Sequence, residues 1–122
     1  MTALAQLEAT LKAQGFTTEA VTTAGGQSFV LLPGFPVASG RFEGRVIDLG
    51  LEVQPNALPG SALHVRADPP LLQSGGHPGG YNILEGQSGL GPAWQYWSFN
   101  LAAALQGGAS LSSIINGVMN RA

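Results

Sequence analysis

The feature that most constrains the fold of this chain is a glycine-rich stretch at residues 75–98, which reads GGHPGGYNILEGQSGLGPAWQYWS. Seven of its residues before Trp94 are glycines, and glycine loses more backbone entropy on ordering than any other residue. We therefore predict one long irregular loop without a helix or strand interior, closed by the aromatic residues Trp94, Tyr96 and Trp97. Long loops in compact domains are commonly functional, so we expect a site in this stretch.

The composition limits the size and the partners of the protein. A length of 122 residues fits one domain, residues 1–122, and the 44% of apolar residues suffice for a core. Charged residues make up only 10%, against about 25% in an average domain. An exposed apolar patch would therefore indicate an interface with a partner or a second copy. The net charge of −2 offers no footprint for nucleic acid or for an anionic membrane.

The chain contains no cysteine, which excludes disulfides, thiolate metal sites and cysteine nucleophiles. No basic segment followed by an apolar run opens the sequence, and no segment approaches about 18 consecutive apolar residues. We therefore expect a soluble, cytoplasmic protein. The two histidines, even with Asp68 or Glu85, match no metal-ligand spacing, and no phosphate-binding glycine motif is present. Neither a metal nor a cofactor is expected.

The first third of the chain predicts a helix followed by a hairpin. Residues 2–14 are the expected helix, and Gly15 is its natural stop. The apolar stripe of this helix consists of Leu4, Leu7 and Leu11. Residues 18–23 and 27–32 are rich enough in β-branched and apolar residues to predict two strands. Residues 33–40, PGFPVASG, are expected outside the sheet because both prolines lack an amide donor.

The rest of the chain predicts two more strands and two helices. Residues 41–53 predict a strand whose apolar residues share one parity, namely Ile47, Leu49, Leu51 and Val53. Residues 62–66 predict a short strand, and residues 99–105 a short helix. The last helix is expected after Ser110, its N-cap, and Gly117 within it suggests close packing. The predicted fold is α+β: an N-terminal helix, a four-stranded antiparallel meander, a long irregular loop and a C-terminal helix.

Four segments resemble the ubiquitin-conjugating (UBC, or UBC/RWD-like) fold: residues 32–36 (LPGFP), 47–53 running into Pro55 and Pro59, 65–71 (VRADPPL) and 94–98 (WQYWS). The nearer similarity is to bacterial relatives of that fold, which are encoded beside ubiquitin-like proteins, ThiF-type activating enzymes and JAB-type peptidases, a setting of antiviral defence operons. The resemblance extends over nearly the whole chain. It implies as partners a ubiquitin-like protein and a ThiF-type activating enzyme or second conjugating enzyme. Assembly into a homo-oligomer is a further prediction.

The sequence departs from UBC enzymes at their chemical centre. These enzymes carry a His-Pro-Asn triplet and, about ten residues after its histidine, a cysteine that accepts the ubiquitin-like C-terminus as a thioester. Here the triplet is His77-Pro78-Gly79, and Gln87 and Ser88 stand where the cysteine would be. A thioester relay is therefore excluded for this sequence.

Three hypotheses follow from the resemblance and its departures. The first is a non-catalytic UBC-like module that binds a ubiquitin-like protein or conjugation enzymes in a bacterial ubiquitin-like modification pathway. The second is a conjugating enzyme that uses the hydroxyl of Ser88, activated by His77 or His64, or a sequence whose cysteine has been replaced. The third is an oligomerising scaffold of unrelated role, because a shared architecture alone does not fix function.

The candidate residues each have a plainer structural explanation. The candidates for a catalytic role are His77 and Ser88. His77 can also be a turn residue bonded to nearby backbone, and Ser88 can be an ordinary loop residue without a chemical role. The predicted binding residues are Phe35, Pro59, Tyr81, Trp94 and Trp97. The rings of Trp94, Tyr96 and Trp97 can form a binding platform, and the loop of Phe35 can dock a partner. Trp94 and Tyr96 can equally anchor the loop in the core, and Phe35 can pack against the end of the sheet.

Overall fold

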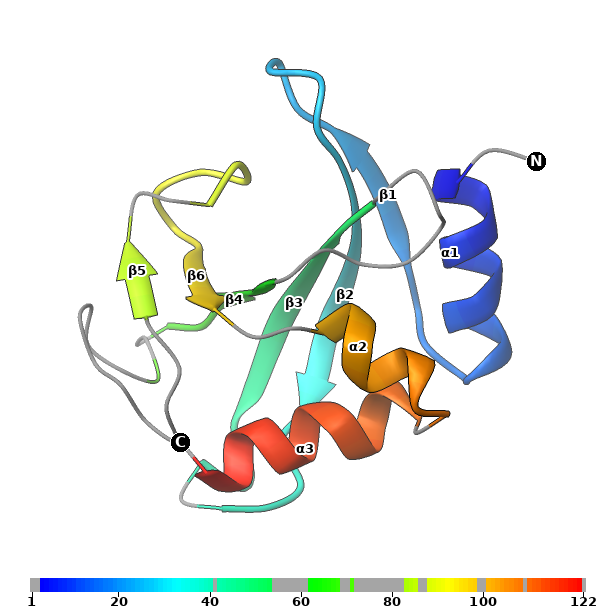
Figure 1. The fold of residues 1–122 in the computed structure, drawn as a ribbon. Helices are drawn as coiled ribbons and strands as arrows, with labels where there is room; N and C mark the ends of the chain where they lie inside the picture. The colour runs from blue at the N-terminus through cyan, green and yellow to red at the C-terminus, as the bar shows by residue number, and fades with distance from the viewer. Residues whose placement is uncertain are drawn as a thin grey trace.

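The computed structural model describes residues 3–40, 42–53, 62–68, 71, 83–85, 88–98, 101–108 and 110–121. The elements follow in the order α1 (Ala3–Ala13), β1 (Glu19–Thr22), β2 (Ser28–Pro36), β3 (Val46–Glu52), β4 (Ala62–Arg66), β5 (Ile83–Glu85), β6 (Gln95–Ser98), α2 (Leu101–Gln106) and α3 (Leu111–Arg121). Figure 1 shows the sheet with α3 lying across it and α1 beside β1 and β2. The predicted α+β class with helices at both ends is confirmed.

The strands form one antiparallel sheet of six, in the order β1-β2-β3-β4-β6-β5. The first four strands form the predicted meander. The predicted count of four strands is nevertheless wrong, because two short strands lie within the glycine-rich stretch. They occupy its glycine-free pieces, residues 83–85 and 95–98, where the entropic cost of ordering glycine does not arise. Strand β6 pairs with β4 and carries Tyr96 and Trp97 into the sheet.

Strand β2 continues through both prolines, contrary to the prediction that residues 33–40 lie outside the sheet. The register between β2 and β3 shifts between Leu32 and Phe35, which is a β-bulge. At the bulge the amide of Gly34 donates to Asp48 Oδ1 at 3.0 Å, so a carboxylate replaces the missing strand carbonyl. Pairing resumes with Phe35 opposite Ile47.

The backbones of the two prolines face away from β3. The amide of Val37 donates to the carbonyl of Arg45, the residue just before β3, so the backbone of Val37 points towards β3. The backbone of the preceding Pro36 therefore points to the opposite side. Pro33 lies an even number of residues after Gln27, so the backbones of the two residues point to the same side of the strand. That side faces β1, because the carbonyl of Gln27 accepts the amide of Thr23. The pairing with β1 has already ended at Leu31. The prolines thus lie along an open edge, the position in a sheet where proline is tolerated.

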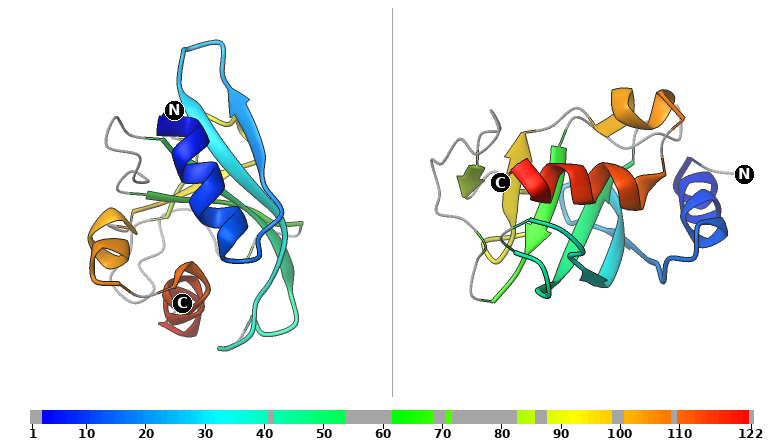
Figure 2. Two further views of the ribbon diagram at one scale, coloured as in Figure 1. Left: turned by 90° about the vertical axis from the view of Figure 1, so that its right-hand side faces the viewer. Right: turned by 90° about the horizontal axis from the view of Figure 1, so that it is seen from below.

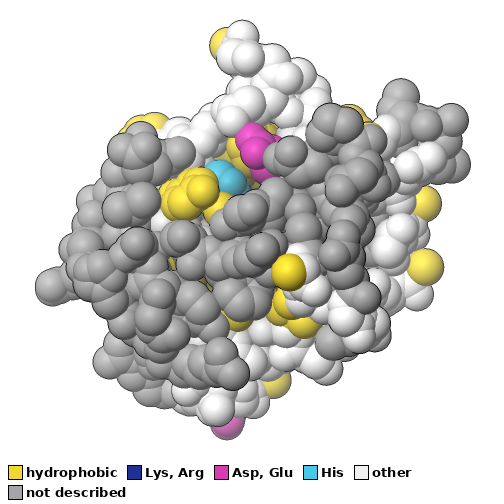
Figure 3. All heavy atoms as spheres, in the orientation of Figure 1, with side chains coloured by type: hydrophobic (Ala, Val, Ile, Leu, Met, Phe, Trp, Pro, Cys, Tyr) yellow, Lys and Arg dark blue, Asp and Glu magenta, His cyan; other side chains and the backbone are white. Residues whose placement is uncertain are grey.

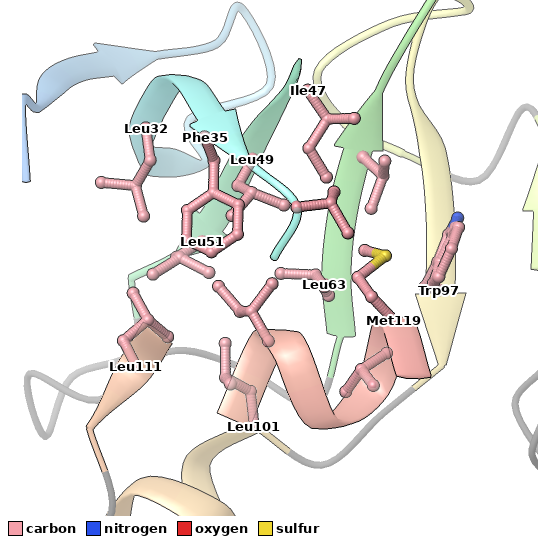
Figure 4. Packing of buried hydrophobic residues seen from close by; sticks show 14 of the residues in the cluster. Leu32, Phe35, Ile47, Leu49, Leu51, Leu63, Trp97, Leu101, Leu111 and Met119 are labelled. Carbon is pink, nitrogen blue, oxygen red and sulfur yellow. The ribbon is translucent and has the colours of Figure 1, made fainter. Parts of the chain in front are cut away.

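One face of the sheet packs against all three helices (Figure 2). The buried apolar residues of this core include Leu7 and Leu11 of α1, Leu101 of α2, and Leu111, Ile115, Val118 and Met119 of α3. They meet alternate residues of the strands, such as Leu32, Leu49 and Leu63, together with Trp97, which is fully buried (Figure 4). The alternate apolar residues predicted within residues 41–53 therefore face the core, as expected.

The start of α3 agrees with its prediction, whereas Gly117 does not. The amide of Ser113 donates to Ser110 Oγ at 3.2 Å, which confirms Ser110 as the N-cap. Gln14 Oε1 accepts the amide of Leu111 at 3.0 Å, so the end of α1 also caps α3. A Cβ added at Gly117 would meet no atom within 4 Å, so this exposed glycine does not mark close packing. Within the described residues, none of the helices has both the length and the apolar character needed to span a membrane.

Candidate functional site

The face of the sheet opposite the helices carries a small group of polar and aromatic residues. Leu31 pairs with Gly50, Gly50 with His64, and His64 with Tyr96 across four neighbouring strands. Directly paired residues project from the same face, so these residues form one row across the sheet. Phe29 belongs to the same face, and its ring lies edge-on to that of His64 with centroids 5.0 Å apart.

Residues 88–94, hereafter the strap, cross this face. A Cβ on Gly89 would collide with the side-chain amide of Gln27. A Cβ on Gly50 would lie 2.5 Å from Leu90 Cδ1, so a glycine in β3 makes room for the leucine. At the far end of the strap, the guanidinium of Arg66 lies 4.7 Å from the centroid of the Trp94 ring. The absence of side chains at two positions therefore lets the strap lie close to the sheet.

Ser88 and His64 form the polar centre of this face. Ser88 Oγ lies 2.7 Å from His64 Nδ1, and the two residues are only 8% and 4% exposed. The amide of Leu90 donates to the same Oγ at 3.2 Å. When the imidazole carries its hydrogen on Nε2, Ser88 can therefore donate its own hydrogen to Nδ1. In Figure 3 a histidine side chain, in cyan, is visible between hydrophobic and acidic side chains.

Burial lowers the pKa of His64 from 6.5 to about 4, because the charged imidazolium would lose its hydration. The ring also lies edge-on to Tyr96, with centroids 5.4 Å apart. His64 is therefore neutral at pH 7, the form that can accept the hydroxyl hydrogen of Ser88. The sequence named both histidines as bases for Ser88, and the structure brings His64 to it, whereas His77 lies outside the described residues.

Asp48 and Arg66 form a second polar group on this face, which the sequence did not reveal. Arg66 donates from Nε and Nη2 to Asp48 Oδ2 at 3.0 and 2.8 Å. The two residues are direct partners in β3 and β4. Strand parity would have shown that both face away from the core, but their pairing depends on the register, which the sequence does not specify.

Three of the predicted aromatic binding residues, Phe35, Trp94 and Trp97, are buried. Trp94 is 4% exposed under Arg66, and Trp97 is fully buried, with its Nε1 donating to Gln95 Oε1 at 3.1 Å. Phe35 is also 4% exposed, so these three rings contribute to packing. That these rings also contact a partner remains a prediction. The other predicted binding residues, Pro59 and Tyr81, lie outside the described residues.

Phe35 nevertheless lines a groove of about 400 Å³. The groove lies between the end of α1 with its following loop, the bulged half of β2 and the first turns of α3; its lining comprises residues 14–17, 32–36, 38, 112 and 116. Phe16 stacks on Phe35 with ring centroids 6.1 Å apart. None of the lining residues is ionisable.

Exposed hydrophobic residues and metal ligands give no further site in the described part of the chain. Among the side chains whose exposure is defined, Val46 is the one large hydrophobic residue that is exposed. No group of three or more His, Asp or Glu side chains in the described ranges could hold a metal ion. Comparisons of the chain with protein-family models, curated proteins and solved structures find no match.

Proposed function

We propose that the chain is a non-catalytic UBC-like module that binds a ubiquitin-like protein or conjugation enzymes of a bacterial ubiquitin-like modification pathway, through the groove lined by Phe35. The observation that carries this proposal is the groove itself, which has a volume of about 400 Å³ and no ionisable side chain in its lining. Such a lining suits an uncharged segment of a partner, because a charged segment would lose hydration without gaining an opposite charge.

Two further observations support a binding role. The helix, the meander β1 to β4 and the final helix follow one another as the UBC resemblance implies. The chain has no cysteine, so it offers no thiol for the chemistry of that family. Pro33 and Pro36 form an exposed and conformationally restricted side of the groove, which lowers the entropy lost when a partner binds.

The test is a titration of the purified protein with the ubiquitin-like protein and the ThiF-type enzyme encoded beside its gene. Ser112→Glu places a charge in the groove, whereas Ser113→Glu places the same charge one residue further along α3, outside the lining. Both positions lie in the first turn of the helix, where a carboxylate is tolerated equally well. We expect Ser112→Glu to weaken binding at least about tenfold and Ser113→Glu to leave it unchanged. If the protein binds neither the ubiquitin-like protein nor the ThiF-type enzyme, the proposal is refuted.

The contact between Ser88 and His64 favours a second function, ester formation by a conjugating enzyme. The Ser88 Oγ would attack the carbonyl carbon of an activated ubiquitin-like C-terminus, His64 Nδ1 would take the hydroxyl proton, and the activating group would leave with the electron pair of the broken bond. The 2.7 Å distance from Oγ to Nδ1 is the hydrogen-bond contact that such a proton transfer requires.

An adduct assay separates this function from simple binding. With activating enzyme and ATP present, the ester demands a mass increase by one ubiquitin-like unit that resists reductant and is lost in mild base. Ser88→Ala should abolish the adduct, whereas Ser113→Ala, which removes an exposed hydroxyl on α3 outside the lining of the groove, should not. If the wild-type protein forms no adduct, ester formation is ruled out, and the binding proposal stands or falls on the titration.

A further inference from the structure

We propose that the strap is a latch on the sheet that is released when His64 takes up a proton. Such a latch is a property of the conformation of residues 88–94 and does not depend on either function proposed above.

The strap is attached to the sheet by few polar contacts. Its backbone bonds are local: Gly91 donates to the Ser88 carbonyl and Trp94 to the Gly91 carbonyl, both at 3.2 Å. Among the described residues, the contact between Ser88 Oγ and His64 Nδ1 is the one hydrogen bond that joins the strap to the sheet. The remaining contacts are steric or involve the ring of Trp94. The strap can therefore lift without breaking any ladder of the sheet.

None of the described contacts of His64 is with a charged group. The His64 ring contacts the rings of Phe29 in β2 and Tyr96 in β6. His64 also pairs with Gly50 in β3 and forms a hydrogen bond with the hydroxyl of Ser88 in the strap. The charged side chains that share this face are engaged elsewhere. Asp48 binds Arg66, and Glu52 accepts a hydrogen bond from Gln27.

A proton on His64 is consequently costly while the strap is closed. The bond to Ser88 could reverse its direction, because Nδ1–H can donate to Oγ, but the imidazolium would remain buried without an ion pair to a described carboxylate. Lifting the strap gives the ring access to water. Protonation and opening are therefore coupled, and each favours the other.

The direction and size of the pH effect follow from this coupling. The pKa of His64 is about 4 with the strap closed, and it returns towards 6.5 when the ring is hydrated. The closed state is fully favoured above pH 6.5 and loses its advantage as the pH falls from 6.5 to 4. At about pH 5, the ratio of open to closed molecules should be about 30-fold higher than at about pH 8.

Hydrogen exchange read by mass spectrometry measures this opening. Protection factors, corrected for the intrinsic pH dependence of exchange, are compared between about pH 8 and about pH 5 for a peptide covering residues 88–94 and for peptides from α1 and β2. We expect the strap to lose protection about 30-fold while the other two keep theirs. An unchanged strap, or an equal loss in all three peptides, would overturn the proposal.

Two variants separate the latch from general loosening. His64→Asn keeps a polar side chain near the position of Nδ1 but cannot titrate, so the strap should lose its pH dependence. Ser88→Ala removes the bond and leaves the histidine, so the strap should be poorly protected at both pH values and the His64 pKa should rise. Retention of the full pH effect in His64→Asn contradicts the latch. If neither variant folds, the NMR titration of the assigned His64 ring in the wild-type protein decides, since a midpoint of about 6.5 or above rules out the coupling.

Discussion

Asp48 joins three parts of the sheet through its two carboxylate oxygens. Oδ1 accepts the amide of Gly34 at the bulge of β2, and Oδ2 accepts two bonds from Arg66 of β4. The residue itself lies in β3 and is only partly buried. Its contribution to stability should therefore come more from the amide that it satisfies than from the ion pair, because partly exposed ion pairs contribute about 0.2–1 kcal/mol.

Asp48→Asn and Asp48→Ala should consequently differ. Asparagine retains an oxygen for the Gly34 amide, so we expect a loss below about 1 kcal/mol in the free energy of unfolding. Alanine removes both interactions and should cost about 1–2 kcal/mol. Urea unfolding of the two variants gives the comparison. Equal losses would show that the bulge does not depend on the carboxylate.

Two glycines provide a matched pair of substitutions to alanine. A Cβ at Gly50 would lie 2.5 Å from Leu90 Cδ1 and 3.3 Å from His64 Cβ, whereas a Cβ at Gly117 would meet no atom within 4 Å. Gly50→Ala should therefore destabilise the protein by about 1–3 kcal/mol through overpacking beneath the strap. Gly117→Ala, in the middle of α3, should stabilise it by up to about 1 kcal/mol. Thermal unfolding of both variants would show shifts of opposite sign; shifts of the same sign would contradict the packing described here.

At the scale of elements, α3 depends on both its own cap and a distant one. Ser110 accepts the amide of Ser113, and Gln14 at the end of α1 accepts the amide of Leu111. Four apolar residues of α3 belong to the core, so fraying of its first turn would expose buried surface. The connection between the two helices is therefore part of what fixes the first helix against the rest of the fold.

We expect Ser110→Ala to lower the free energy of unfolding by about 1 kcal/mol, the usual cost of losing an N-cap. Ser112→Ala, which lies in the same turn but whose side chain makes no capping bond, is the control. It should have no effect or a slightly stabilising one, because alanine favours helix. Chemical denaturation of the pair measures the difference. If both variants lose the same stability, the cap does not hold the helix.

The elements that follow from local pattern were predictable, and those that depend on long-range pairing were not. The stripe of Leu7 and Leu11 and the alternation from Ile47 to Leu51 follow directly from the period of helix and strand. The insertion of β6 beside β4 depends on a chain return that local pattern does not encode. The place of the prolines within β2 could not be predicted, because an edge and a bulge are recognised only once the neighbouring strands are placed.

The candidate site shows the same division. Ser88 could be named from its place in the glycine-rich stretch, but its hydrogen-bond partner is 24 residues away in the chain. Either histidine was equally plausible from the sequence alone. The contact with His64 requires both the face on which β4 presents the ring and the path of the strap, and neither follows from composition or periodicity.

At the scale of the whole molecule, electrostatics has a small role. Charged residues make up 10% of the chain, and the ion pairs among described residues, Arg66 with Asp48 and Lys12 with Glu8, have exposed basic partners. Interactions of this kind are weak and are screened further by salt. Stability should therefore come mainly from the core shared by the sheet and the helices.

We expect the free energy of unfolding to change by less than about 1 kcal/mol between about 50 mM and about 500 mM sodium chloride at pH 7. Denaturant melts at both salt concentrations measure this directly. A charge-reversal variant of Arg66 serves as a reference, because it replaces the attraction to Asp48 by repulsion and should make stability rise with salt. A strong salt dependence of the wild-type protein would point to ionic interactions that the core-based account omits.

The prolines of β2 have a consequence for what this protein does at high concentration. An edge strand that offers free amides can template the growth of cross-β fibrils, and natural sheets avoid this with short or proline-containing edges. Here β1 is four residues long, β5 is three, and the part of β2 beyond β1 has proline at both outward-facing positions, 33 and 36. Replacing both prolines with threonine would restore two donors, and we expect faster fibril formation by thioflavin fluorescence than in the wild-type protein at equal concentration. The two prolines thereby keep one copy of the chain from extending the sheet of another.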